Sequence, residues 1–394
     1  MAYMEEYENS RTSNGRILML LLLLTVASQF DGASFESIAK TAMYGMWGAV
    51  FIIYSFSLKY IVRTRYVLTG TVAAVLLVLQ YLLASVMLPN YNPPIIMPFI
   101  TSLLFYIVGM LFFRMGLSTH DLQVAFRAYC IACILLGMYI WFTFYGDLGH
   151  WFDTDVNLYG KKNSAGQILA VGVIISFFYL KSKTWASKLI NIIIGLSLTF
   201  IIMIIHCRTA LLALCAVIFV NLFLLSSRKQ KMVIIAVLPF VFLLVFNMPF
   251  LKELVNQALY INKFTAYGEF TINAFLSNRL DWFTAAYEKF TQSATTVWLG
   301  IGRSYVDNLF INVLTSSGII GALIIASVYL NRFTTNLRFT KIHNEYILLK
   351  TLSIFYIVES FAEGLPPYGP GACSVIFWLL CGYCDVLHRE DIQN

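Results

Sequence analysis

The sequence predicts an all-α polytopic membrane protein. Of its 394 residues, 59% are hydrophobic and 12% are charged, and that charged fraction is about half the usual value for a soluble globular domain. The apolar residues form blocks of about 16–25 positions separated by short polar breaks, and an α-helix of that length crosses a bilayer. Aromatic residues make up 16% of the chain, which excludes a disordered polypeptide. We expect a single membrane domain over residues 1–394.

The apolar blocks predict about twelve membrane-spanning helices in order along the chain. The first block follows Arg11 and Arg16 and resembles a signal peptide, but we interpret it as a short first span. The last two blocks are separated by a proline-rich break. The expected spans are 17–30, 41–58, 67–88, 95–113, 122–145, 164–180, 189–205, 209–226, 232–247, 305–330, 345–361 and 370–387.

The positions of Lys and Arg predict the orientation of these spans. If the N-terminus is cytoplasmic, each short inner connection is basic, as at 59–65, 181–188 and 228–231. The alternation continues along the whole chain, so we expect an even number of spans with both termini inside. This assignment places Arg332 in an inner connection.

The longest outer segment, 248–304, lies between predicted spans nine and ten. Two sets of apolar residues within it recur at intervals of three or four, which is typical of amphipathic helices. We expect these helices to lie on the outer membrane surface. The two sets are Leu251, Leu254, Val255 and Leu259, and Leu276, Leu280, Phe283, Tyr287 and Phe290.

Basic residues at the outer ends of spans are the main candidates for a site, because the positive-inside rule does not explain them. Guanidinium groups match the oxygens of phosphate in a bidentate geometry. Converging outer cations therefore favour a shared anionic ligand such as a pyrophosphate, and contact with lipid phosphates is the alternative. The candidates are Lys161, Lys162 and the adjacent Asn163 at the mouth of span six, Arg208 between spans seven and eight, Arg279 in the long outer loop, and Arg303 before span ten.

Acidic residues accompany these cations. Asp307, followed by Asn308, stands at the entrance to span ten, and Arg303 is expected to pair with it if the helix already begins there. Asp307 is either a helix cap or a carboxylate that orients or deprotonates a hydroxyl group. Glu359 and Glu363, at the outer end of span eleven, either line the same cavity or mark the membrane interface.

Other motifs carry less weight. Asp153-Thr154-Asp155 matches a metal-binding pattern that is short and common, and Cys381 and Cys384 have metal-site spacing inside an apolar span without further ligands. Ordinary packing is the better interpretation of these two cysteines. No basic run with interleaved aromatic residues suggests nucleic-acid binding. We predict no metal and no cofactor.

The order of motifs in residues 160–325 resembles a known family. Arg208-Thr209 opens an apolar span, and 278–282 reads Asn-Arg-Leu-Asp-Trp in the long outer loop. The segment 298–302, Trp-Leu-Gly-Ile-Gly, then leads to Asp307-Asn308 and to Ser-Gly-Ile-Ile-Gly at 317–321. This arrangement resembles the Wzy-type polysaccharide polymerases and the related O-antigen ligases, which share a GT-C-like fold, and Lys162-Asn163 resembles their basic-Asn element.

The resemblance implies a metal-independent glycosyltransferase of the bacterial plasma membrane. It would join undecaprenyl-pyrophosphate-linked oligosaccharide repeats on the outer face, with a chain-length regulator as a further expected partner. Arg208 and Arg279 would neutralise the leaving pyrophosphate, and Asp307 would orient or activate the acceptor. The remaining substrate-binding residues would be Lys161, Lys162, Asn163, Arg303, Asn308 and Glu363.

Two alternatives to the polymerase remain open. O-antigen ligases usually carry His before the Asn where this chain has Asp307, which favours a polymerase of O-antigen, capsule or exopolysaccharide repeats. A flippase or transporter of lipid-linked sugars would place polar groups near mid-membrane and often contains broken helices. The predicted ionisable residues gather instead at the outer ends of spans.

Overall fold

The computed structural model describes residues 2–55, 64–147, 158–181, 184–225, 279–339, 343–369 and 371–393, with a few single positions between 226 and 278. Within these residues all regular secondary structure is helical, which confirms the all-α prediction. Six of the described helices are long and apolar enough to cross a membrane. The chain therefore has the helices of a membrane protein.

The described helices follow the predicted spans closely. The first half of the chain contains α1 (Ala2–Ala27), α2 (Glu36–Ser55), α3 (Arg65–Met87), α4 (Ile96–Arg114), α5 (Thr119–Ile140) with the π-helical turn η2 (Trp141–Tyr145), α7 (Lys162–Phe178) and α8 (Trp185–Ile204). The second half contains α9 (Arg208–Leu225), α14 (Arg279–Phe290), α15 (Ala294–Leu299), α16 (Leu309–Arg338), α17 (Asn344–Ala362) and α18 (Gly371–Gln393).

Among the described residues, length and composition support fewer membrane spans than the twelve predicted. Span 232–247 lies almost entirely outside the described residues. Three apolar stretches are shorter than a full crossing, at Asn14–Ala27 within α1, at Lys162–Phe178 and at Arg208–Asn221 within α9, and α17 carries three residues of the types Asp, Glu, Lys and Arg. The count of about twelve spans and the GT-C-like fold therefore stay predictions.

Helices α4 and α18 approach each other closely at the centre of the core. A Cβ atom added to Gly109 would lie 2.0 Å from the carbonyl oxygen of Leu379, and one added to Gly382 would lie 1.9 Å from that of Tyr106. Small residues allow two helix backbones to meet in this way. The absence of side chains at these two positions therefore sets the separation of α4 and α18.

Helix α16 is interrupted at Gly318, where φ is 68° and ψ is −175°. The segment Trp298–Gly302, here called the clasp, packs its backbone against this break. In the clasp, the N–H of Ile301 donates to the Thr315 carbonyl at 2.9 Å, and that of Gly302 donates to the Ser316 carbonyl at 3.0 Å. The side chain of Gln80 on α3 donates to the carbonyls of Ser317 and Leu299.

These bonds explain how a broken helix is accommodated in an apolar protein. An interrupted spanning helix leaves backbone carbonyls that lipid cannot satisfy, and here the clasp and Gln80 supply donors. Glycine is required on both sides, because Gly300 and Gly318 have positive φ and a Cβ on either would meet the backbone of the other segment within 2.5 Å. The clasp thus connects α14 and α15 rigidly to α16.

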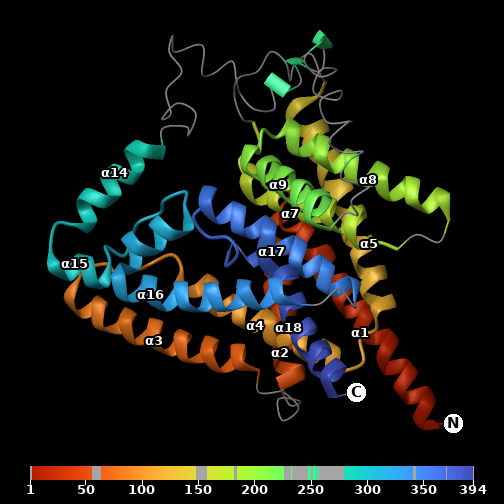
Figure 1. Ribbon diagram of the computed structural model, residues 1–394, viewed down its shortest axis with the longest axis horizontal. Coiled ribbons are helices and arrows are strands. Elements are labelled where there is room, and N and C mark those ends of the chain that lie inside the picture. The colour runs from red at the N-terminus through yellow and green to blue at the C-terminus, as the bar shows by residue number, and fades with distance from the viewer. Residues whose placement is uncertain are drawn as a thin grey trace.

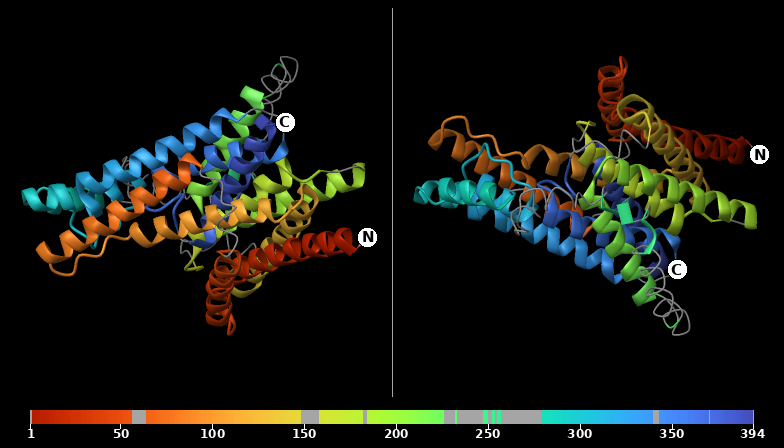
Figure 2. Two further views of the ribbon diagram at one scale, coloured as in Figure 1. Left: turned by 90° about the horizontal axis from the view of Figure 1, so that it is seen from below. Right: turned by 90° about the horizontal axis from the view of Figure 1, so that it is seen from above.

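The clasp also determines where α14 lies. Helices α3 and α16 run side by side, and α14 and α15 lie at one end of this pair, while α8 and the N-terminus lie toward the other end of the molecule (Figures 1 and 2). In α14, Ala286 and Phe290 are buried while Trp282 and Tyr287 are largely exposed. A helix is found over 279–290, where the second set of apolar residues predicted one, but Leu280 and Tyr287 of that set are exposed, so its amphipathic face stays a prediction. The first falls largely outside the described residues.

The α4–α18 contact generates a test with a matched control. Gly109→Ala places a methyl group on the backbone of α18, so we expect the thermal unfolding midpoint in detergent to fall by several degrees, corresponding to about 1–3 kcal/mol of overpacking. Gly48→Ala in α2 meets nothing within 4 Å and should leave the midpoint unchanged or slightly higher. Equal midpoints for the two variants would contradict the proposed close contact.

Candidate functional site

A cavity of about 360 Å³ lies where the start of α7 faces Tyr305 and the segment that follows α17. The start of α7 contributes charged and amide side chains, and the segment after α17 contributes a carboxylate and a proline turn. The lining residues are Gly160, Lys161, Lys162, Asn163, Ser164, Gln167, Tyr305, Glu363, Leu365, Pro366 and Gly369. A cavity of this size with a few converging polar groups is typical of a small-molecule site.

The carboxylate of Glu363 contacts side chains from three different helices of the site. It lies directly after α17, is almost fully buried, and accepts hydrogen bonds from Asn163 Nδ2 at 3.1 Å and Thr209 Oγ1 at 3.3 Å. Its Oε1 also lies 3.6 Å from Nη2 of Arg279. Because these partners stand at the first residues of α7, α9 and α14, three helix starts converge on one side chain.

The environment of Glu363 makes it unusually basic for a carboxylate. Burial is the main cause, and the negative charge of Asp307 adds to it, so that the pKa of Glu363 rises to about 7. Arg279, Thr209 and Asn163 act in the opposite direction but do not outweigh burial. Near neutral pH this group therefore exists in both protonation states.

Arg279 pairs with Asp307, and not only with Glu363. Its Nε lies 3.3 Å from Oδ2 of Asp307, and its Nη1 donates to the carbonyl of Ala362. The sequence-based expectation that Arg303 pairs with Asp307 is wrong. Helix α16 begins only at Leu309, so these two residues do not share a helical turn, and Arg303 is exposed and forms no ion pair with a described residue.

Asn308, and not Asp307, caps α16. Its Oδ1 accepts from the N–H of Ile311 at 3.0 Å and its Nδ2 donates to the carbonyl of Phe361 at 2.9 Å. The capping interpretation of Asp307 is therefore corrected, since Asn308 satisfies the helix start. Asn308, which we expected to bind substrate, uses both ends of its amide within the protein.

The two lysines at the mouth of α7 differ in their surroundings. Lys161 forms ion pairs with Asp31 Oδ1 at 3.1 Å and with Glu36, which also pairs with Lys40. Hydrogen bonds from Lys161, then from Lys40 and from a backbone N–H, lower the pKa of Glu36 to about 2, so Glu36 is ionised at any physiological pH. The charge of Lys161 is thus compensated locally. Lys162 is half-buried and lines the cavity.

The predicted arginines therefore hold unequal positions. Arg279 is part of the contact network around Glu363. Arg208 is half-buried at the first residue of α9, next to Thr209, whose hydroxyl donates to Glu363. Arg303 is exposed in the turn that follows the clasp. The structure brings Arg279, Asp307, Glu363 and Asn163 together and leaves Arg303 outside that group.

Gln167 and Tyr305 are site residues that the sequence analysis missed. Gln167 lies four residues after Asn163 on the same face of α7 and is buried. Its Nε2 donates to Glu359 Oε2 at 3.1 Å, and the other oxygens of these two side chains have no partner among the described residues. Two amides one turn apart in an apolar helix were a usable signal. No sequence pattern pointed to Tyr305.

The site combines groups suited to two kinds of ligand. Carboxylate, amide and hydroxyl side chains around a small cavity suit the hydroxyl groups of a sugar, and a guanidinium at its edge suits phosphate oxygens. In the part of the chain that the structure describes, no group of three His, Cys, Asp or Glu side chains could ligate a metal. The sequence-suggested pair Asp153 and Asp155 lies outside the described residues.

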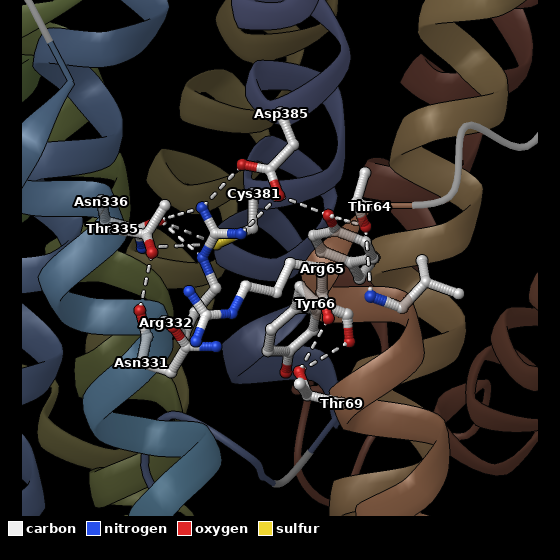
Figure 3. A network of polar contacts seen from close by, with 12 residues as sticks. Thr64, Arg65, Tyr66, Thr69, Asn331, Arg332, Thr335, Asn336, Cys381 and Asp385 are labelled. Carbon is white, nitrogen blue, oxygen red and sulfur yellow. Dashed lines mark hydrogen bonds and ion pairs between the residues drawn. The ribbon is translucent and has the colours of Figure 1, made fainter.

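A second polar network lies buried between α16 and α18, and it corrects the placement of Arg332. This residue is not in an inner connection but inside α16, only 1% exposed. Its Nη1 and Nη2 lie 2.6 and 2.9 Å from the two oxygens of Asp385, and its Nε donates to Asn336 Oδ1 at 2.7 Å (Figure 3). Tyr106 donates to Asp385 and Thr64 bonds to Tyr106.

The same network contacts one of the two cysteines that have metal-site spacing. Cys381 and Cys384 lie fully buried in α18 with free thiols, and Cys381 accepts from Asn336 Nδ2 at 3.5 Å. The guanidinium of Arg332 also lies 5.5 Å from the ring centroid of Tyr66, within cation–π range. Two aligned charge-assisted bonds and an aromatic face compensate the burial of the charge.

Comparison of the chain with protein-family models and with curated proteins finds no match. The function is therefore inferred from the residues of the chain, their geometry and the motif resemblance.

The buried pair Arg332–Asp385 generates a stability test. Asp385→Leu leaves the guanidinium without its counter-ion, so we expect a loss of about 3–5 kcal/mol in the free energy of unfolding. The double variant Arg332→Met/Asp385→Leu should recover most of this loss. Glu390→Gln removes one partner of the exposed Arg114–Glu390 pair and should change stability by less than about 1 kcal/mol. A double variant no more stable than Asp385→Leu alone would contradict this account.

Proposed function

We propose that the protein is a glycosyltransferase that joins undecaprenyl-pyrophosphate-linked oligosaccharide units on the outer face of a bacterial plasma membrane. In this reaction a hydroxyl of one unit attacks the anomeric carbon of another, and the lipid pyrophosphate leaves. Arg279 and Arg208 would bind the pyrophosphate, and the cavity next to Glu363 would bind the attacking sugar. The site would face outward, with both termini cytoplasmic.

The observation that carries the proposal is the convergence of groups from distant parts of the chain. Asn163, Thr209, Arg279 and Asp307 meet around Glu363 although they belong to different elements. Four of the segments that resemble the polymerase family therefore have a residue in this group, whereas 298–302 and 317–321 contact each other at the break in α16. An apolar protein that gathers a guanidinium, carboxylates and amides around one cavity has the groups needed to hold a charged lipid-linked sugar.

Arg279 retains the capacity to bind phosphate. A guanidinium offers five N–H groups, and among the described residues Arg279 makes three contacts, to Asp307, Glu363 and the Ala362 carbonyl. The ion-pair distances of 3.3 and 3.6 Å exceed the range of about 2.7–2.9 Å for a short charge-assisted hydrogen bond. Two N–H groups have no partner among the described residues, and in this proposal they bind phosphate oxygens, a contact that developing negative charge would strengthen in the transition state.

The ligase alternative differs only in the acceptor. A polymerase extends chains when lipid-linked repeats are the sole substrate, whereas a ligase requires a separate lipid-core acceptor. Assaying one preparation first with repeats alone and then with the core acceptor added distinguishes the two. A chain-length regulator stays an expected partner of the polymerase.

A transporter of lipid-linked sugars is a second candidate, and two observations favour it. Helix α16 is broken at Gly318, and the Arg332–Asp385 pair lies buried between helices rather than at an outer end; both are features of carriers. However, the clasp and Gln80 occupy the broken region with protein hydrogen bonds. Movement of a lipid-linked sugar between leaflets of proteoliposomes by the protein alone would support transport.

The glycosyltransferase proposal is tested at Arg279. Arg279→Ala removes the guanidinium next to the cavity, so we expect chain extension by purified protein in nanodiscs to fall at least about 100-fold, because a preorganised charge stabiliser is lost. Lys289→Ala changes an exposed cation on the same helix and should extend chains at the normal rate. Polymer length on gels measures both. A normal rate for Arg279→Ala would refute the pyrophosphate role.

A further inference from the structure

Two carboxylates contact Arg279, and they differ in position. Asp307 is 34% exposed at its side chain and lies nearer to the guanidinium, whereas Glu363 is 4% exposed. Only Glu363 of the two lines the cavity. A general base must reach the proton that it removes, directly or through one water. The position of the two groups therefore favours Glu363.

Neutral donors hold Glu363 in a defined orientation. Asn163 bonds to Oε2 and Thr209 bonds to Oε1, at 3.1 and 3.3 Å. The two oxygens of a carboxylate accept about four hydrogen bonds in total, more than the described residues supply, and Glu363 lines the cavity. The same two donors come from α7 and α9, which fixes the carboxylate relative to both helices.

Cations face Glu363 from three elements. Arg279 of α14 is the nearest, at 3.6 Å, and Lys161 and Lys162 at the start of α7 line the same cavity. Lys161 is already paired with two carboxylates. Arg208 stands next to Thr209 at the start of α9. Arg279 itself shares its charge between Asp307 and Glu363.

Acidic and neutral titratable groups complete the surroundings. Asp307 precedes α16, and Glu359 lies one turn earlier on α17. The thiols of Cys207 and Cys373 and the phenol of Tyr305 are the other neighbours. Burial together with the adjacent negative charge raises the pKa of Glu363 to about 7. A carboxylate with this basicity matches the requirement for a base that operates near neutral pH.

We propose that Glu363 is the general base of the glycosyl transfer and that Asp307 is a positioning residue that holds Arg279. The inference rests on the proposed function and deepens it. The acceptor oxygen forms a bond to the anomeric carbon of the donor sugar while the bond from that carbon to the pyrophosphate oxygen breaks. The electron pair leaves with the lipid pyrophosphate beside Arg279. The acceptor proton moves to Glu363, which later releases it to water.

The experiment compares pH–rate profiles of the full chain in nanodiscs, with a lipid-pyrophosphate-linked oligosaccharide as substrate. In the wild type, the rate should fall about tenfold for each pH unit below the pKa of Glu363, because only the ionised carboxylate accepts a proton. Glu363→Gln should lower the rate at least about 100-fold and remove this acidic limb. Binding of undecaprenyl pyrophosphate, measured separately, should be retained.

Three further variants separate a base from a structural residue. Glu359→Gln changes the neighbouring buried carboxylate on the same helix, which does not line the cavity, and should keep the acidic limb. Asp307→Asn should weaken pyrophosphate binding through Arg279 and also keep the limb. Glu363→Asp retains a carboxylate withdrawn by one methylene, so it should be faster than Glu363→Gln and show an acidic limb again.

Distinct results would overturn the proposal. Persistence of the acidic limb in Glu363→Gln, or its disappearance in Asp307→Asn, would exclude Glu363 as the base. Loss of pyrophosphate binding in Glu363→Gln as large as its loss of rate would assign it a binding role instead. If Glu363→Gln does not fold, Glu363→Asp decides the question. An unchanged rate and an unchanged pH–rate profile, although the carboxylate is withdrawn by one methylene, would exclude Glu363 as the base. Failure of the wild type to form any glycosidic bond would refute the proposed function itself, before any variant is compared.

Discussion

The buried carboxylate of Glu363 is the constraint on which the site depends. A carboxylate that is almost fully removed from water must be paired and hydrogen-bonded, and its partners here come from the first residues of α7, α9 and α14. These three helix starts are consequently held at one point, next to the cavity. The buried carboxylate of Glu363 therefore brings together the helix starts that form the site.

The broken helix α16 provides the second constraint. Its interruption at Gly318 accepts the clasp, and its cap at Asn308 bonds to the end of α17. Asp307 lies in the chain between the clasp and this cap, and it pairs with Arg279 at the start of α14. Because Asn308 performs the capping, the carboxylate of Asp307 is available to hold the guanidinium. The backbone geometry at the start of α16 therefore determines that Asp307 pairs with the guanidinium of Arg279.

The protein contains two kinds of buried charge. Arg332 and Asp385 form a compact pair with two close contacts and aromatic neighbours, an arrangement that ties helices together. Arg279 and Glu363 lie 3.6 Å apart beside a cavity, and the described residues do not use all of the hydrogen-bonding capacity of either side chain. Incomplete pairing is the property that distinguishes a site able to accept a ligand from a structural ion pair.

The sequence by itself determined the helical class, most helix positions and the candidate cations and carboxylates near helix ends, because apolar block length and charge placement depend on the lipid solvent and not on packing partners. It did not determine that Arg332 is buried, that Asp307 pairs with Arg279 rather than Arg303, or that Gln167 and Tyr305 line the cavity. Asn163 and Glu363 are 200 positions apart. Contacts at such separations follow from how helices pack, so only the tertiary structure decided them.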